Sequence, residues 1–178
     1  MRIASIVPNS IVDGPGIRFT IFTQGCSHHC PGCHNPSTHD PSGGYEESIE
    51  KIVDQLRSDP LIDGITLSGG DPFEQPVECT KLIWRVKAVN PKYTVWTYTG
   101  YTYEQIKSAK NYLWDLLFQN SDVVVDGPFI ESLKSYDLKF RGSSNQRLID
   151  TKKTLSSDSI VLWDSEYSIL DKFQVPES

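Results

Sequence analysis

The chain has no long hydrophobic run, and it contains only one methionine and four cysteines in 178 residues. No apolar stretch approaches the ~20 residues that a membrane-spanning helix needs. The first apolar run is broken early by Pro8 and Asn9, unlike the core of a signal peptide. These absences predict a cytoplasmic protein with no membrane partner. The chain also has no excess of positive charge. The net charge of −6 at pH 7 predicts that nucleic acid is not a partner, because phosphate backbones attract basic surfaces.

The few cysteines are unevenly placed, since three of the four lie in the segment QGCSHHCPGCH at 24–34. Cytoplasmic thiols are kept reduced, so a disulfide is disfavoured. Clustered cysteines in that compartment more often hold a metal. We therefore take Cys26, Cys30 and Cys33 as the candidate metal ligands.

Three cysteines at this spacing suit two kinds of metal site. Zinc would need a fourth ligand, and a neighbouring histidine would complete a Cys3His set. The histidines within reach are His28, His29, His34 and His39. A [4Fe–4S] cluster normally takes four cysteines, so three would leave one iron open, as catalytic sites do. Cys79 is not expected to complete either set, because it falls in a predicted amphipathic helix and free cysteine is commonly buried. The spacing alone favours zinc and iron equally.

Short β-rich segments alternate with longer segments of helical periodicity, which predicts an α/β fold. The expected strands are 16–25, 64–72, 92–101 and 121–129, and the expected helices are 45–58, 77–89 and 102–120. Parallel neighbours need a long connection, so the alternation predicts βαβ crossovers and mostly parallel strands. About five or six strands are too few for a complete TIM barrel. A partial TIM-like βα barrel or an open sheet remains, and we expect the partial barrel.

The length predicts one domain over 1–178, with a core at about 5–150 and a C-terminal extension at 151–178. The extension contains one apolar run, SIVLWDSEY. This run suits either an edge strand or a tail that binds a partner, and the sequence does not decide between them.

Four unusual loops directly follow the expected strands: the cysteine loop, SGGDP, YTGY and DGPF. The carboxyl ends of parallel strands meet at one edge, where ligands gather, so we expect these loops to form one site. The glycines of SGGDP allow a close backbone approach to a ligand, and Asp71 can accept a hydrogen bond from an ammonium group. A structural zinc loop would not explain this turn, which favours iron.

Taken together, the motifs resemble a known family. VDGPGIRFTIFTQGC, CPGCHNPST, LSGGDP, YTGY, VVDGPF and RGSSNQRL follow one another between about residues 5 and 150. The cysteine spacing resembles the signature of the radical S-adenosylmethionine (SAM) superfamily. The whole set resembles the activating proteins of anaerobic ribonucleoside-triphosphate reductase. A single motif of this length is weakly specific, whereas the ordered set is highly specific.

The resemblance implies that the three cysteines hold a [4Fe–4S] cluster whose fourth iron is bound by the amino and carboxylate groups of SAM. A low-potential electron donor, such as flavodoxin or ferredoxin, would drive reductive cleavage of SAM. Hydrogen abstraction from a glycine Cα of the partner reductase would then give a glycyl radical. The chain would thus be a radical SAM oxidoreductase that activates anaerobic (class III) ribonucleotide reductase.

The resemblance also implies which residues contact SAM: the glycine-rich turn for the methionine ammonium group, the third-cysteine region for adenosine, and the YTGY strand end for ribose or carboxylate. These cofactor-binding residues are Gly32, Cys33, His34, Gly69, Gly70, Asp71, Tyr98, Thr99 and Gly100. Two positions depart from the superfamily pattern, which usually has glutamate in place of Asp71 and an aromatic residue in place of Gly32.

Some motif residues and two other functions stay open. Asp126, Arg141 and Asn145 suit either a binding role or a turn. Phe73, Tyr101 and Phe129 are candidate anchors for the partner protein. One alternative function is activation of another glycyl-radical enzyme, such as pyruvate formate-lyase. The other is a zinc-binding interaction module without enzyme activity.

Overall fold

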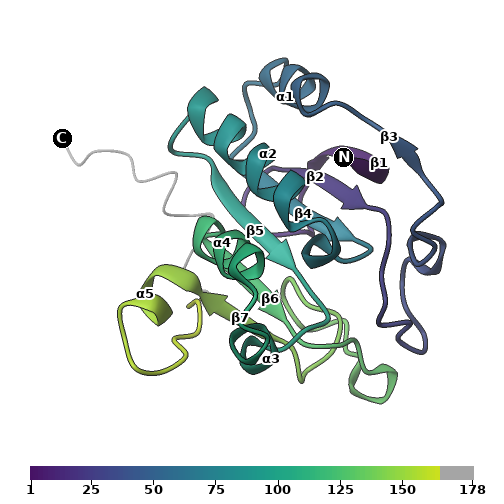
Figure 1. The fold of residues 1–178 in the computed structure, drawn as a ribbon, viewed down its shortest axis with the longest axis vertical. Helices are drawn as coiled ribbons and strands as arrows, with labels where there is room; N and C mark the ends of the chain where they lie inside the picture. Colours follow the sequence, from purple (N-terminus) through teal and green to yellow (C-terminus); the bar gives the residue numbers. More distant parts are fainter. Residues whose placement is uncertain (165–178) are drawn as a thin grey trace.

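The computed structural model describes residues 1–164 as a seven-stranded sheet with helices packed on one face (Figure 1). The strand order is β3-β1-β2-β4-β5-β6-β7. The strands are β1 (Arg2–Ser10), β2 (Arg18–Thr23), β3 (Tyr45–Glu46), β4 (Gly64–Gly69), β5 (Thr94–Tyr98), β6 (Val123–Asp126) and β7 (Arg147–Asp150). The α-helices are α1 (Ile49–Arg57), α2 (Pro76–Val89), α3 (Tyr103–Ser108), α4 (Tyr112–Asn120) and α5 (Thr151–Leu155). Short 3-10 turns lie at Pro36–Thr38, Pro72–Glu74 and Glu131–Leu133.

The middle of the sheet is parallel, and its edges are antiparallel. β2, β4, β5 and β6 run parallel to one another. β1 pairs antiparallel with β2 and β3, and β7 pairs antiparallel with β6. The α/β class and the parallel centre are therefore confirmed. The strand at β1 was not predicted, because Pro8 and the left-handed Asn9 (φ 61°) interrupt its pattern and its register with β2 shifts twice.

The main core lies between the sheet and α1, α2 and α4, which cover one face (Figure 1). Each helix turns a stripe of buried side chains towards the strands, as the helical period requires. These side chains are Ile52, Val53 and Leu56 of α1, Cys79, Leu82, Ile83 and Val86 of α2, and Leu117 and Phe118 of α4. In residues 1–164 none of the helices has the length and hydropathy needed to span a membrane.

The helix predicted over 102–120 is two helices, α3 and α4. Lys110 between them has a left-handed backbone (φ 50°), which ends the first helix. Asn111 then caps α4, because its side chain accepts a hydrogen bond from the N–H of Leu113. The prediction of one continuous helix was wrong, since a polar cap residue outweighed the continuing apolar pattern.

The opposite face of the sheet is covered by loops and aromatic side chains rather than by α1, α2 and α4. Trp96, Val123 and Val125 form a second buried cluster there, against Phe140 and Trp163. Leu162 pairs with Ile149 of β7 through an isolated antiparallel bridge. The extension therefore begins with α5 and returns to the sheet edge, and its remaining residues, 165–178, lie outside the described part of the chain.

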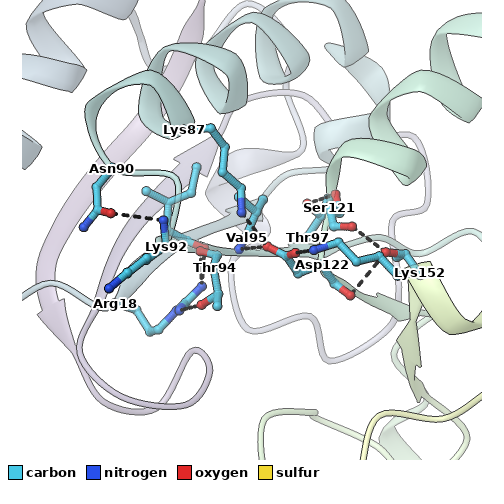
Figure 2. A network of polar contacts seen from close by, with 12 residues as sticks. Arg18, Lys87, Asn90, Lys92, Thr94, Val95, Thr97, Ser121, Asp122 and Lys152 are labelled. Atoms are coloured by element: carbon cyan, nitrogen blue, oxygen red, sulfur yellow. Dashed lines mark hydrogen bonds and ion pairs between the residues drawn. The ribbon is translucent and has the colours of Figure 1, made fainter.

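A polar network joins the amino ends of the central strands (Figure 2). The carboxylate of Asp122 accepts hydrogen bonds from the backbone N–H of Val95 (2.8 Å), Lys87 Nζ (3.0 Å) and Lys152 Nζ (2.7 Å). Burial alone raises the pKa of Asp122, but these donors outweigh it and hold the pKa below its ordinary value. The network ties α2 and α5 to the start of β6.

Arg18 of β2 lies at the same end of the sheet and is fully buried. Its guanidinium donates to Thr66 Oγ1 (3.1 Å), to Thr94 Oγ1 (2.6 Å), and to the backbone oxygens of Ile65 and Thr94. Burial lowers the pKa of Arg18 to about 10, so the side chain stays charged at neutral pH. These contacts cross from β2 to β4 and β5.

Candidate functional site

The four unusual loops meet at the carboxyl edge of the parallel strands, as predicted. They line one cavity of about 550 Å³, which lies within the size range of small-molecule sites. The cysteine loop follows β2, Gly69 ends β4 and Gly70 follows it, Thr99 and Gly100 follow β5, and Gly127 follows β6. The parallel centre of the sheet is what brings together segments that are distant in sequence.

Cys26, Cys30 and Cys33 all line this cavity, are partly exposed and are free thiols. The backbone N–H of Asn35 donates a hydrogen bond to Cys33 Sγ (3.4 Å). Burial raises the pKa of the Cys26 thiol to about 11, so a metal that binds there displaces a proton. Cys79 is fully buried in α2, which confirms its prediction as a core residue.

The base of the cysteine loop packs directly on the end of β4. A Cβ on Gly70 would lie 2.2 Å from the backbone oxygen of Gly25, and Gly69 has a left-handed φ of 97°. The N–H of Gly70 donates to Thr23 O (2.7 Å), and that of Asp71 donates to Gly25 O (2.8 Å). Glycine is therefore required at both positions for packing alone, because side chains there would push the cysteine loop away.

The carboxylate of Asp71 is buried and joins the ends of three strands. Its Oδ2 accepts from His28 Nε2 (2.8 Å), Thr99 Oγ1 (2.9 Å) and the N–H of Gly100 (3.0 Å). Its Oδ1 accepts from the N–H of Phe73 (2.9 Å). Asp71 thus holds the cysteine loop, through His28, against the loops that follow β4 and β5.

His28 lies on the cavity wall, edge-on to the ring of Tyr101 at a centroid distance of 4.3 Å. The hydrogen bond that His28 donates to Asp71 raises the pKa of His28, while burial opposes the rise. A Cβ on Gly100 would come within 2.4 Å of the His28 ring. Glycine at position 100 therefore makes room for His28, a relation that the sequence pattern did not reveal.

The far wall of the cavity is formed by the segment after β6. The ring of His34 lies 4.9 Å from that of Phe129, between centroids. Tyr98 Oη donates to the backbone oxygen of Phe140 (2.7 Å), which fixes this segment to β5. Burial raises the pKa of Tyr98, so its hydroxyl remains a donor at neutral pH.

Most of the residues predicted to bind the metal or SAM line the cavity. They are Cys26, Cys30, Cys33, His34, Gly69, Gly70, Tyr98, Thr99 and Gly100. Gly32 and Asp71 are not on its wall. Gly32 has a left-handed φ of 70° and packs against the Glu131 carboxyl group, whereas Asp71 acts from behind His28 and Thr99.

Several residues of the cavity wall were not predicted from the sequence. Phe22 and Ser68 are cross-strand partners on the helix-free face, and the period-two alternation of β2 and β4 could have placed them there. Val12, Tyr136 and Leu138 also line the cavity, but apolar residues in loops carry no such pattern. Phe73, proposed as an exposed anchor, is buried beneath Trp114, so that prediction was wrong.

The structure also shows the surroundings of Asp126, Arg141 and Asn145, whose roles the sequence left open. Asp126 is buried and accepts from Arg147 Nε (3.0 Å) and from the N–H of Tyr103 (2.7 Å), a structural role. Asn145 Nδ2 donates to Pro128 O (2.8 Å). Arg141 lines the cavity.

A second hollow, of about 660 Å³, lies on the outer side of the cysteine loop. Of the three clustered cysteines only Cys26 lines it, beside His29 and His39. We place the candidate site in the other cavity because all three cysteines reach it. In residues 1–164 no three side chains of His, Cys, Asp or Glu converge on a single metal-ion position. A cubane binds each thiolate through a separate iron, so it does not require such convergence.

Comparison with known proteins identifies relatives over most of the chain. A family described as "4Fe-4S single cluster domain" matches residues 12–149. A protein of Escherichia coli (strain K12) named anaerobic ribonucleoside-triphosphate reductase-activating protein is 39% identical over 145 residues, covering 78% of this chain and 92% of the relative. Proteins with the same name from Salmonella typhimurium (39% over 152 residues, 82% and 96% covered) and Enterobacteria phage T4 (36% over 153 residues, 83% and 93% covered) are also similar.

Proposed function

Because this chain belongs to the family of anaerobic ribonucleoside-triphosphate reductase-activating proteins, we propose that it activates anaerobic (class III) ribonucleotide reductase by generating a glycyl radical on it. The observation that carries the proposal is the cavity in which three free cysteines meet the glycine-rich strand ends. The names of the relatives do not favour activation of pyruvate formate-lyase, and the family of the 4Fe-4S domain does not favour a zinc module.

We infer that Cys26, Cys30 and Cys33 hold a [4Fe–4S] cluster and that SAM occupies the rest of the cavity. The donor set fits, because thiolates are the usual ligands of such clusters and three of them leave one iron for SAM. When bound, the cluster supplies the electron for reductive cleavage of SAM, and the cleavage supplies the hydrogen-abstracting chemistry that acts on the reductase glycine.

The chain's own residues would position SAM from three sides. Gly69 and Gly70 present a backbone free of side chains where the ammonium group is expected, and Thr99 and Gly100 adjoin them from β5. His34, which lies against Phe129, offers a ring on the side expected for adenosine. Asp71 sits behind this wall, so we assign it to positioning His28 and Thr99 rather than to direct contact.

The partner would enter where the cavity opens, near Val12 and Tyr136. Both side chains line the cavity, and they are 71% and 91% exposed. Exposed apolar and aromatic side chains at the mouth of a site are suited to anchoring a protein loop. A low-potential donor such as flavodoxin or ferredoxin would supply the electron.

We propose that the described chain is one radical SAM domain with the architecture of a partial TIM-like βα barrel. Helices α1, α2 and α4 cover the outer face, and the site lies at the carboxyl ends of parallel strands, as in complete barrels. The antiparallel β1 and β7 would leave the barrel open, which would admit a protein substrate.

Anaerobic reconstitution with iron and sulfide tests the proposed function. The protein should contain iron and sulfide in equal amounts. After mixing with class III reductase, SAM and a reductant, the reductase should show a glycyl-radical signal in electron paramagnetic resonance. Pyruvate formate-lyase in place of the reductase is the matched control and should show none. A colourless protein with one zinc, or an intact cluster that yields no radical on the reductase, would contradict the proposal.

A further inference from the structure

The RGSSNQ segment folds into a tight turn that presents Arg141 to the candidate site. Gln146 Oε1 accepts hydrogen bonds from the backbone N–H of Gly142 (2.9 Å) and of Ser143 (3.2 Å). Arg141 Nη1 donates to the backbone oxygen of Gln146 (2.8 Å), which closes the turn from the other side. The side-chain amide of Gln146 therefore organises the backbone on which Arg141 stands.

The turn is also fixed to the central strands. Gln146 Nε2 donates to Gly127 O (3.0 Å), and Asn145 Nδ2 donates to Pro128 O (2.8 Å), so it is held to the loop after β6. The residue before Arg141 is bound to β5 through Tyr98 Oη and Phe140 O. Arg141 is thus held in place before any ligand binds, which lowers the entropic cost of binding.

Arg141 has a buried donor that is not used. Its Nε is buried and has no hydrogen-bond partner among residues 1–164. A buried donor without a partner is costly, and native structures rarely leave one without a reason. Two arginines of the sheet differ, since Arg18 donates to Thr66 and Thr94 and Arg147 pairs with Asp126 and Glu104.

The charge of the cavity indicates what the guanidinium group of Arg141 would bind. Apart from histidines and cysteines, the described residues that line the cavity include two charged side chains, Asp13 and Arg141. Oδ2 of Asp13 already accepts from Ser10 Oγ (2.6 Å) and Thr20 Oγ1 (3.1 Å). In residues 1–164 no ion pair joins Arg141 to a carboxylate. The guanidinium fork is shaped to bind carboxylates through parallel hydrogen bonds.

We propose that Arg141 binds the carboxylate of the amino-acid part of SAM and so positions the cofactor beside the three cysteines. The inference rests on the proposed function, because it takes SAM as the occupant of the cavity. A carboxylate has two oxygens, so one can accept from Arg141 while the other is used elsewhere. An acidic side chain of the partner protein offers the same chemistry, and the experiment separates the two sources.

Equilibrium binding under anaerobic conditions tests the inference without measuring turnover. The cluster-loaded wild type, Arg141→Gln, Arg141→Lys and the matched control Arg85→Gln are titrated with SAM, with decarboxylated SAM and with the reductase. Arg85 is exposed on α2 and pairs with Glu50, away from the cavity. Arg141→Gln should weaken SAM binding roughly 10- to 100-fold, the usual range for a charge-assisted hydrogen bond. It should leave binding of decarboxylated SAM unchanged, and Arg85→Gln should behave as wild type.

Selectivity between the two ligands decides the outcome. An equal loss of affinity for SAM and decarboxylated SAM would show that Arg141 only shapes the cavity wall. Unchanged affinity for SAM with weaker binding of the reductase would assign the carboxylate to the partner. Either result overturns the proposal. Should Arg141→Gln fail to fold, Arg141→Lys replaces it, with a smaller loss that must still be selective for SAM. A failure of the proposed function looks different, because the wild type itself would then bind no SAM or yield no glycyl radical.

Discussion

Two polar clusters lie at opposite ends of the same parallel strands and differ in how completely they are satisfied. At the amino ends, Asp122 is matched by two lysines and a backbone donor, and Arg18 by threonines and carbonyls (Figure 2). At the carboxyl ends, Asp71 is fully used, whereas three cysteines are free of disulfides and Arg141 Nε has no hydrogen-bond partner among residues 1–164. The satisfied cluster stabilises the sheet, whereas the unsatisfied one is where we propose that ligands bind.

The difference between the two clusters agrees with the usual roles of the two ends of a parallel sheet. Residues at the amino ends of parallel strands commonly serve stability, and those at the carboxyl ends serve chemistry. Asp71 lies at the boundary between these roles, because it is a structural carboxylate placed at the functional end. Substitutions at the two ends should therefore separate loss of ligands from loss of stability.

The largest effect is expected from Cys30→Ala, which removes one of three thiolates. Two thiolates are too few to retain a cubane, so iron content and brown colour should both be lost after anaerobic reconstitution. Iron and sulfide analysis with visible absorbance measures this. Cys79→Ala is the matched control and should keep the colour, with a loss of about 1 kcal/mol from a small core cavity. Loss of the cluster in Cys79→Ala would contradict its place in the core.

Asp71→Ala should reduce both the stability of the protein and its iron content. It leaves the donors of His28, Thr99, Gly100 and Phe73 without their shared acceptor, which should cost about 3 kcal/mol of unfolding free energy. The cysteine loop would also lose its link to β5, so iron content should fall. Urea unfolding and iron analysis measure the two effects. Asp71→Asn keeps one acceptor and should lose less, and an Asp71→Ala protein as stable as wild type would show that water replaces the carboxylate.

Asp122→Ala should reduce stability and leave the cluster intact. We expect a loss of about 2 kcal/mol at pH 7, because Lys87, Lys152 and Val95 lose a partly buried acceptor. The folded-state pKa of Asp122 lies below its ordinary value of 3.8, so this contribution is present above pH 3.8 and is lost as the pH falls below it. The gap between wild type and variant should therefore narrow near pH 3. Denaturant unfolding at both pH values measures it, and a constant gap would refute the assignment.

The smallest effect on stability is expected from Tyr136→Ser at the mouth of the cavity. The side chain is 91% exposed, so the unfolding free energy should change by less than about 0.5 kcal/mol. Affinity for the reductase should nevertheless fall about tenfold, since aromatic residues are frequent anchors in interfaces. Tyr112→Ser is the matched control, 73% exposed on α4 away from the cavity, and should change neither quantity. Equal reductase affinity for the two variants would place the interface elsewhere.

The fold was predictable where local patterns are strong and less so where tertiary contacts decide. The parallel strands and α1 and α2 follow from period and spacing. β7 is four residues long and acquires its strand character only by pairing with β6. The break between α3 and α4 depends on the left-handed backbone of Lys110. Lysine rarely adopts this conformation, so the residue type does not predict the break.

The candidate site also combines features that local sequence predicts with features that only tertiary contacts decide. The cysteines and the glycine-rich turn were recognisable because few structures need those residues at those spacings. Gly100 and His28 were not recognised as a pair, because their relation depends on how closely two loops approach one another. The cytoplasmic location and the electron donor remain predictions.

By itself the sequence determined the three-cysteine loop, the order of the four parallel strands along the chain, and the family, because these depend on residue type, spacing and order along the chain. Only the tertiary structure decided that Asp71 lies behind the cavity wall and Arg141 on it. Burial and hydrogen-bond partners arise when distant segments pack together. The same carboxylate or guanidinium can therefore hold the fold or await a ligand, depending on what surrounds it.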